Sequence, residues 1–177
     1  DDVESRGLGD VYKRQLQSLL LEMNGYRVKP MTREEIKMIA LSVAKRFKLT
    51  EWHKRQLDVV LEGITEIVNI EILSEEEWQE LTLNLTKGHF SPNELTIRIP
   101  ESTYLFACQG DKDSLEVILH EMGHMFLMHQ TYLHKADEPP TTNENAEWQA
   151  DTFAEIILEE MGYHTKQISL DLGRPEM

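Results

Sequence analysis

The sequence predicts an α+β fold that is mostly helical and contains a small antiparallel sheet. Apolar residues recur at three- and four-residue intervals over 32–47, 50–67 and 115–126, which indicates helices with one buried face. Apolar and polar residues alternate over 68–73 and 95–99, as in half-buried strands. The fold class rests on these two periodicities.

The helix starts are predicted from pairs of residues with the spacing of a capping box. Thr32 and Glu35 have this spacing before the first apolar stripe, and Asp113 and Glu116 have it before the stripe of residues 115–126. The turn formers at 92–93 precede the last strand, so residues 88–99 are predicted to be a β-hairpin.

Length and composition indicate one soluble domain. The chain of 177 residues holds one substantial core but not two of ordinary size. Its formal net charge is −14 without a basic cluster, which argues against direct nucleic-acid binding, because duplex affinity depends on phosphate neutralisation by lysine and arginine. No apolar run approaches the roughly 20 residues that cross a bilayer, and Cys108 is the single cysteine. We therefore expect a cytoplasmic protein without membrane contact.

Residues 1–15 differ in character from the rest of the chain. The piece Asp10–Gln15 resembles a translated sequencing-adaptor fragment that recurs at the ends of metagenomic reading frames. A genuine disordered N-terminus is the other interpretation. We expect residues 1–15 to lie outside the fold and residues 16–177 to form a single domain.

Two histidines are placed to bind one metal ion. Residues of an α-helix advance by about 100°, so His120 and His124 lie one turn apart on the same face. Glu121 is rotated by about 100° from His120, beside the open position of the metal, where it can take a proton from water. The pattern indicates a zinc hydrolase with a zincin-like fold, in which the sheet lies beside the metal-binding helix. The pentapeptide alone also fits a core helix with ordinary hydrogen-bonded histidines.

A third metal ligand is predicted on the next helix. Glu147 and Asp151 are four residues apart and hence on one face. Glu147 is the candidate ligand, and Asp151 is the candidate acceptor for the second ring N–H of a metal-binding histidine. A solvated acidic face is the plainer interpretation of this pair. The packing stripe of the same helix comprises Ala150, Phe153, Ala154, Ile157 and Leu158.

Other residues compete with Glu147 for the third position. His129 follows His120 by nine positions, about 180° around a helix, and points away unless the helix ends first. Glu144 precedes the next helix and can cap it instead, and His134 lies in a polar loop. Glu147 is the preferred ligand.

Four stretches of the chain resemble the ImmA/IrrE-type metallopeptidases, a family found with repressors of phages and mobile elements. The stretches are Leu95–Pro100, Tyr104–Asp111, Leu119–His129 and Glu147–Ala154, and the resemblance extends over residues 26–161. It implies that His120, His124 and Glu147 bind Zn²⁺ and that Glu121 is the catalytic base. It also implies a protein substrate, a helix-turn-helix transcriptional repressor that is cleaved. The family's second helix often ends in Leu-Leu-Met-Pro, whereas residues 157–162 here read Ile-Leu-Glu-Glu-Met-Gly.

The predicted function is a zinc-dependent endopeptidase, and two other classes remain open. One is a non-catalytic metal-containing regulatory module that binds a repressor without cleaving it; Glu121 argues against it, because a structural zinc site usually has four protein ligands and needs no base. The other is a metal-free helical scaffold, which requires the pair Glu147 and Asp151 to be coincidental. Metzincins are disfavoured, because Leu127 and Gln130 stand where their motif has glycine and histidine.

Two segments are expected to contact the substrate. The hairpin of residues 88–99 is predicted to provide a sheet edge that holds an extended peptide through main-chain hydrogen bonds. Residues 129–145 have turn formers and no periodicity, so we expect a loop over the metal. Tyr132 or His134 in this loop is a candidate donor to the oxyanion, although a solvated loop residue is the plainer interpretation of each.

Overall fold

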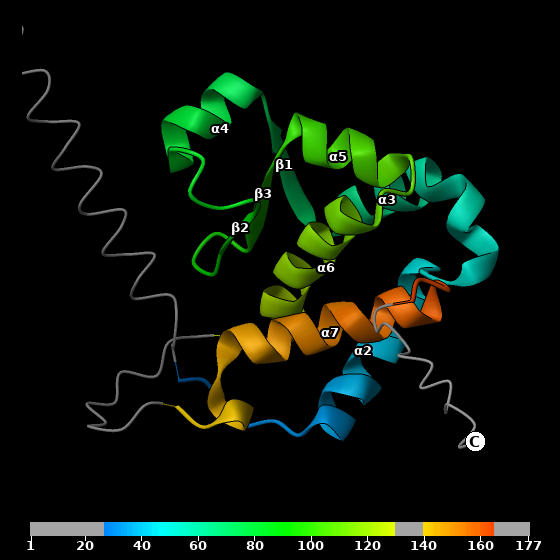
Figure 1. Cartoon of the computed structure of the whole chain (residues 1–177), viewed down its shortest axis with the longest axis vertical. Coiled ribbons are helices and arrows are strands. Elements are labelled where there is room, and N and C mark those ends of the chain that lie inside the picture. Colours follow the sequence, from blue (N-terminus) through cyan, green and yellow to red (C-terminus); the bar gives the residue numbers. More distant parts are fainter. Residues whose placement is uncertain (1–26, 130–139, 165–177) are drawn as a thin grey trace, which may run out of the picture.

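The computed structural model describes residues 27–129 and 140–164, and the N-terminal segment 1–15 lies outside them. Most of the described chain is helical, and three short strands form one sheet, which confirms the α+β prediction (Figure 1). In chain order the elements are α2 (Arg33–Phe47), the 3-10 helix η1 (Glu51–Gln56), α3 (Leu57–Thr65), β1 (Asn69–Leu73), α4 (Glu75–Thr82), β2 (His89–Ser91), β3 (Thr96–Pro100), α5 (Glu101–Cys108), α6 (Lys112–Phe126), the 3-10 helix η2 (Thr142–Glu144) and α7 (Ala146–Glu160).

The sheet is mixed, so the prediction of an antiparallel sheet is wrong. The strand order is β1-β3-β2; β2 pairs antiparallel with β3, and β1 pairs parallel with β3. Alternation of apolar and polar residues determines which face of a strand is buried, but it carries no information on strand direction. The direction results from the chain path: helix α4 connects β1 to β2, and the hairpin turn then brings β3 alongside β1 in the same direction.

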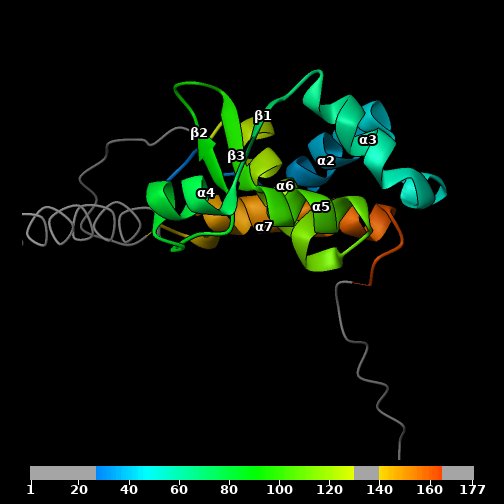
Figure 2. The ribbon, with the colours of Figure 1, turned by 90° about the horizontal axis from the view of Figure 1, so that it is seen from above.

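The hairpin predicted over residues 88–99 is confirmed. Its strands β2 and β3 pair with Phe90 opposite Ile97. Leu95, the last residue of the connecting turn, has a positive φ of 51°. Because β3 is the central strand, β2 forms one edge of the sheet, and Figures 1 and 2 show this edge beside the C-terminal half of α6.

Helix α6 lies between the sheet and α7 (Figure 1). Its apolar face forms the centre of the core. Ile118, Leu119 and Met122 of α6 are at most 1 % exposed, as is Phe153 of α7. Helix α2 covers the other side of α7 and contributes the fully buried Ile36. Burial of these side chains fixes which face of α6 is left for polar residues.

The backbones of α6 and α7 approach each other closely at Gly123. A Cβ atom at this position would lie 3.0 Å from the Cα of Ala150 and 3.1 Å from its carbonyl oxygen. A side chain here would require the α7 backbone to shift by a few tenths of an ångström, which glycine avoids. The contact brings the first two turns of α7 against the histidine-bearing turn of α6.

Of the two predicted helix starts, the one at Thr32 is confirmed and the one at Asp113 is not. Thr32 and Glu35 form the predicted capping box of α2. Helix α6, however, begins earlier than predicted from Asp113, because Asp111 is the N-cap and accepts a hydrogen bond from the Ser114 N–H at 2.9 Å. Within residues 27–129 and 140–164, no helix combines the length and apolar character that crossing a bilayer requires.

Candidate metal centre

The three predicted metal ligands lie together between α6 and α7. One nitrogen from each of His120 and His124 and one carboxylate oxygen of Glu147 all lie within 4.8 Å of one another. The Glu147 Oε2 atom is 3.3 Å from His120 Nε2, and its Oε1 atom is 3.6 Å from His124 Nε2. Two imidazoles and a carboxylate converging on one point are the ligand set of a catalytic zinc site.

Asp151 lies one turn after Glu147 on α7 and contacts the outer nitrogen of His120. Its Oδ1 atom is 2.8 Å from His120 Nδ1. The imidazole therefore donates its Nδ1–H to Asp151 and turns Nε2 toward His124 and Glu147. This is the arrangement in which a carboxylate fixes the tautomer of a metal-binding histidine.

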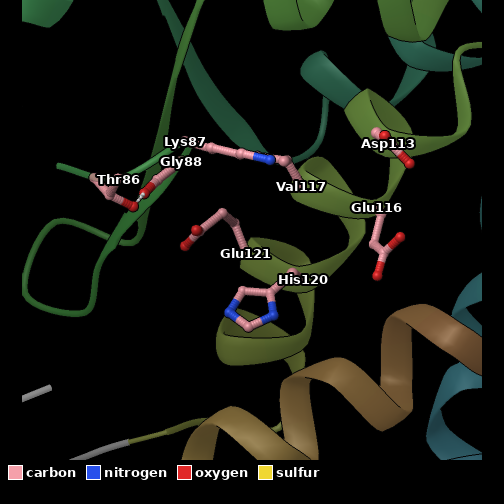
Figure 3. Close-up of a pocket in the computed structure, with 8 residues that line it drawn as sticks. All are labelled: Thr86, Lys87, Gly88, Asp113, Glu116, Val117, His120 and Glu121. Carbon is pink, nitrogen blue, oxygen red and sulfur yellow. Dashed lines mark hydrogen bonds between the residues drawn. The ribbon is translucent and has the colours of Figure 1, made fainter. Parts of the chain in front are cut away.

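Glu121 points away from α7, toward the start of β2. Figure 3 shows its carboxylate directed at the segment that carries Gly88, while His120 lies one residue back on the same helix. The Phe90 backbone N–H acts on the carboxyl group in the direction that lowers its pKa. A Cβ atom at position 88 would lie 2.9 Å from both Cγ and Oε1 of Glu121, so Gly88 leaves the space that the carboxylate occupies.

Glu121 is buried, and burial raises its pKa to about 7 despite the opposing effect of the nearby His120. Desolvation disfavours a carboxylate anion, which explains the direction of the shift. A carboxyl group with a pKa near neutrality can both accept and return a proton at physiological pH.

A pocket of about 430 Å³ opens beside Glu121 and His120 (Figure 3). Its walls are the segment 86–88, which leads into β2, and residues of α6 from Asp113 to Glu121. The pocket gives solvent and part of a ligand access to both side chains.

The two histidines of the centre have opposite tendencies to hold a proton in the metal-free chain. For His120, burial disfavours protonation, but the hydrogen bonds to Asp151 and Glu147 outweigh it, and its pKa is raised to about 10. For His124, burial and the neighbouring His120 charge lower the pKa far below its usual range. The two Nε2 atoms lie 3.0 Å apart, so a proton on His120 is donated to His124.

His129 is predicted to point away from the centre unless the helix ends before it, and in the structure the helix does end first. Helix α6 ends at Phe126, and Met128 has a positive φ of 55°, so the chain turns back. The buried His129 ring then lies with Nδ1 2.8 Å from His124 Nδ1 and Nε2 2.9 Å from the Oε1 atom of Gln149. His129 therefore contacts the outer nitrogen of His124 and does not compete with Glu147.

The remaining alternatives for the third ligand, and the candidate oxyanion donors, lie elsewhere in the chain or outside the described residues. Glu144 lies in η2, where its carboxylate accepts hydrogen bonds from Thr141 and pairs with Arg27 at 3.4 Å. The N-cap of α7 is Asn145 rather than Glu144. His134 and Tyr132 lie outside the described residues.

Sequence reasoning missed Gln149 altogether. It is fully buried on α7, within the apolar stripe. A polar residue inside such a stripe is itself a signal, because buried amides require hydrogen-bond partners.

No model of a known protein family, no curated protein and no solved structure matches this chain. The chemistry that the chain can perform is therefore inferred from the side-chain geometry of its described residues.

Proposed function

We propose that this protein is a zinc-dependent endopeptidase of the ImmA/IrrE type with a zincin-like site, and that it cleaves a helix-turn-helix repressor in the cytoplasm. The observation that carries the proposal is the convergence of His120, His124 and Glu147 beside the buried Glu121. The repressor as substrate rests on the sequence resemblance alone.

The chemistry of the donor set supports a divalent metal such as zinc. Two imidazole nitrogens and one carboxylate supply three of four tetrahedral positions, and the fourth is left for water or substrate. Asp151 orients one histidine from outside the cluster, as at other histidine-metal sites. In the metal-free chain, the Nε2 atoms of His120 and His124 share a proton, and a metal cation would take the place of that proton.

The residues around the cluster supply the remaining parts of peptide hydrolysis. A bound zinc ion would supply Lewis acidity, which acidifies water and polarises a carbonyl group. Glu121 takes the proton of the attacking water and returns it to the leaving amine. The edge strand β2, adjacent to Glu121, offers main-chain groups to an extended peptide.

The test compares wild type with the variants Glu121→Gln and Glu80→Gln. Each is analysed for bound metal and for cleavage of a purified repressor encoded beside this gene. Glu80 is an exposed glutamate on α4, so Glu80→Gln controls for the change of charge. We expect one zinc ion per chain in all three, unchanged cleavage in Glu80→Gln, and a loss of at least about 100-fold in Glu121→Gln, the usual contribution of a general base.

Three results would count against the proposal. Full activity of Glu121→Gln would remove Glu121 as the base. Wild-type protein without affinity for zinc would remove the metal centre. Tight binding of the repressor by zinc-loaded wild type without cleavage would favour the non-catalytic regulatory module.

A further inference from the structure

His129 and Gln149 form a buried chain of hydrogen bonds that leads from the protein backbone to His124. The Gln149 Nε2 atom donates to the carbonyl oxygens of Lys29 at 2.9 Å and Asn143 at 2.7 Å. A carbonyl oxygen can only accept, so these two contacts determine which end of the amide carries the hydrogens. The Oε1 atom of Gln149 must therefore be the acceptor that faces His129.

The orientation of Gln149 determines the tautomer of His129. Because Oε1 of Gln149 only accepts, the His129 Nε2 atom at 2.9 Å must carry a hydrogen. A neutral imidazole has one donor and one acceptor, so Nδ1 of neutral His129 is the acceptor. This atom lies 2.8 Å from His124 Nδ1, and a hydrogen bond between them requires His124 to donate.

The tautomer of His124 then decides whether it can bind a metal. With its hydrogen on Nδ1, neutral His124 has a lone pair on Nε2, the atom that faces His120 Nε2 at 3.0 Å and Glu147 Oε1 at 3.6 Å. If the hydrogen bond ran in the opposite direction, neutral His124 would carry its hydrogen on Nε2 and would have no lone pair for the cluster. Binding of a metal by His124 Nε2 therefore requires that His124 donate the hydrogen bond to His129, which is the direction that Gln149 imposes.

We infer that His129 and Gln149 are positioning residues that hold His124 in its metal-binding tautomer, the role that Asp151 has for His120. This inference rests on the proposed metal centre but not on the proposed proteolysis. The acceptors differ in charge: Asp151 is an exposed carboxylate, whereas His129 is a buried neutral ring. His124 is thus oriented by a buried group without a negative charge.

The chain of hydrogen bonds also links the centre to the N-terminal side of α2. Lys29 lies in the segment before this helix, and the neighbouring Val28 and Met31 donate backbone hydrogen bonds to the carbonyls of Glu144 and Asn143 at 2.8 Å and 3.0 Å. The carbonyls that orient Gln149 are therefore held by the pairing of two segments more than 100 residues apart in the sequence. Because these backbone carbonyls are held in place, they keep the Gln149 amide in the one orientation that determines the tautomer of His129.

The test measures zinc affinity of the full-length chain, without reference to cleavage. His129→Asn keeps an acceptor, its Oδ1, at the place of Nδ1, whereas His129→Leu has a similar size and no acceptor. We expect His129→Leu to bind zinc about 10 to 100 times more weakly than wild type, and His129→Asn to restore most of the affinity. Gln149→Met, which loses the anchor, should also weaken binding. Thr152→Val replaces another buried polar residue of α7 and should leave affinity unchanged.

A second measurement uses the wild-type chain, so it does not depend on whether a variant folds. Nitrogen-15 NMR of the histidine rings distinguishes the two tautomers, and we expect His124 to carry its hydrogen on Nδ1. A hydrogen on Nε2 of His124 would overturn the inference. Equal zinc affinity of wild type and His129→Leu, or equal weakening in His129→Leu and His129→Asn, would overturn it as well.

The outcome is separate from that of the proposed function. A chain that binds zinc and shows these differences in affinity, yet cleaves no repressor, would support the positioning role and contradict the peptidase. If the wild-type chain cleaves the repressor and His129→Leu binds zinc as tightly as wild type does, the peptidase is supported and the positioning role is contradicted.

Discussion

A proton on His120 and a metal ion compete for the same nitrogen atom. Burial disfavours the protonated ring, but hydrogen bonds to Asp151 and Glu147 outweigh it, and the pKa of His120 is raised to about 10. In the metal-free chain at about pH 8, this histidine is therefore charged. A metal ligand must be neutral, so binding releases the proton.

We expect zinc binding at about pH 8 to release about one proton from His120, and apparent affinity to fall as the pH decreases below about 10. Asp151→Asn removes the carboxylate that accepts from Nδ1, lowers the pKa of His120, and should reduce the number of protons released. Calorimetric titration in two buffers with different ionisation enthalpies measures the proton release. Identical binding enthalpies in both buffers would contradict the prediction.

At the scale of elements, the metal centre depends on how closely α7 approaches α6. Gly123 lies against the backbone of Ala150, between the turn that carries His124 and the turn that carries Glu147 and Asp151. A Cβ atom at position 123 would require the α7 backbone to move by a few tenths of an ångström, because the two nearest atoms belong to the Ala150 backbone and cannot rotate away. Displacement of α7 would separate the carboxylates from the imidazoles.

Gly123→Ala should therefore lower the free energy of unfolding by about 1 to 3 kcal/mol, the usual cost of overpacking, and weaken zinc binding as well. Urea denaturation in the presence of a chelator and a separate zinc titration measure the two effects. Gly63→Ala on α3 is the matched control, because a Cβ there would meet nothing within 4 Å. Alanine favours helices over glycine, so the control should be neutral or stabilising by up to about 1 kcal/mol. Equal effects of the two substitutions would contradict the role of Gly123.

For the whole molecule, a metal ion would link two helices that hold the core together. Its ligands come from α6 and α7, whose apolar faces pack against α2 and the sheet. A ligand that binds only the folded chain stabilises it by an amount that grows with the ratio of its concentration to its dissociation constant.

Zinc at about 100 times its dissociation constant should stabilise the fold by about 2.7 kcal/mol, or roughly 5–10 °C in melting temperature for a chain of this size. His124→Ala should abolish this increase, whereas His164→Ala, which removes an exposed histidine outside the cluster, should retain it. Thermal unfolding followed by fluorescence, with and without zinc, provides the measurement. An equal increase in His124→Ala would place the metal elsewhere.

The sequence by itself determined the features that depend on short-range periodicity. A repeat of about 3.6 residues placed His120 and His124 on one face, and the four-residue spacing of Glu147 and Asp151 placed both carboxylates on one face of α7. Turn-forming residues predicted the hairpin, and the spacing of Thr32 and Glu35 predicted the cap of α2. In each case the residues that decide the structure are near neighbours in the chain.

Only the tertiary structure decided the direction of β1 and the positions of His129 and Gln149. The parallel pairing of β1 results from the path through α4, and His129 reaches His124 because α6 ends before Met128 and the chain reverses. Gln149 finds its partners in Lys29, 120 residues away, and Asn143. Local periodicity carries no record of such contacts, because they arise from the packing of segments that are distant in sequence.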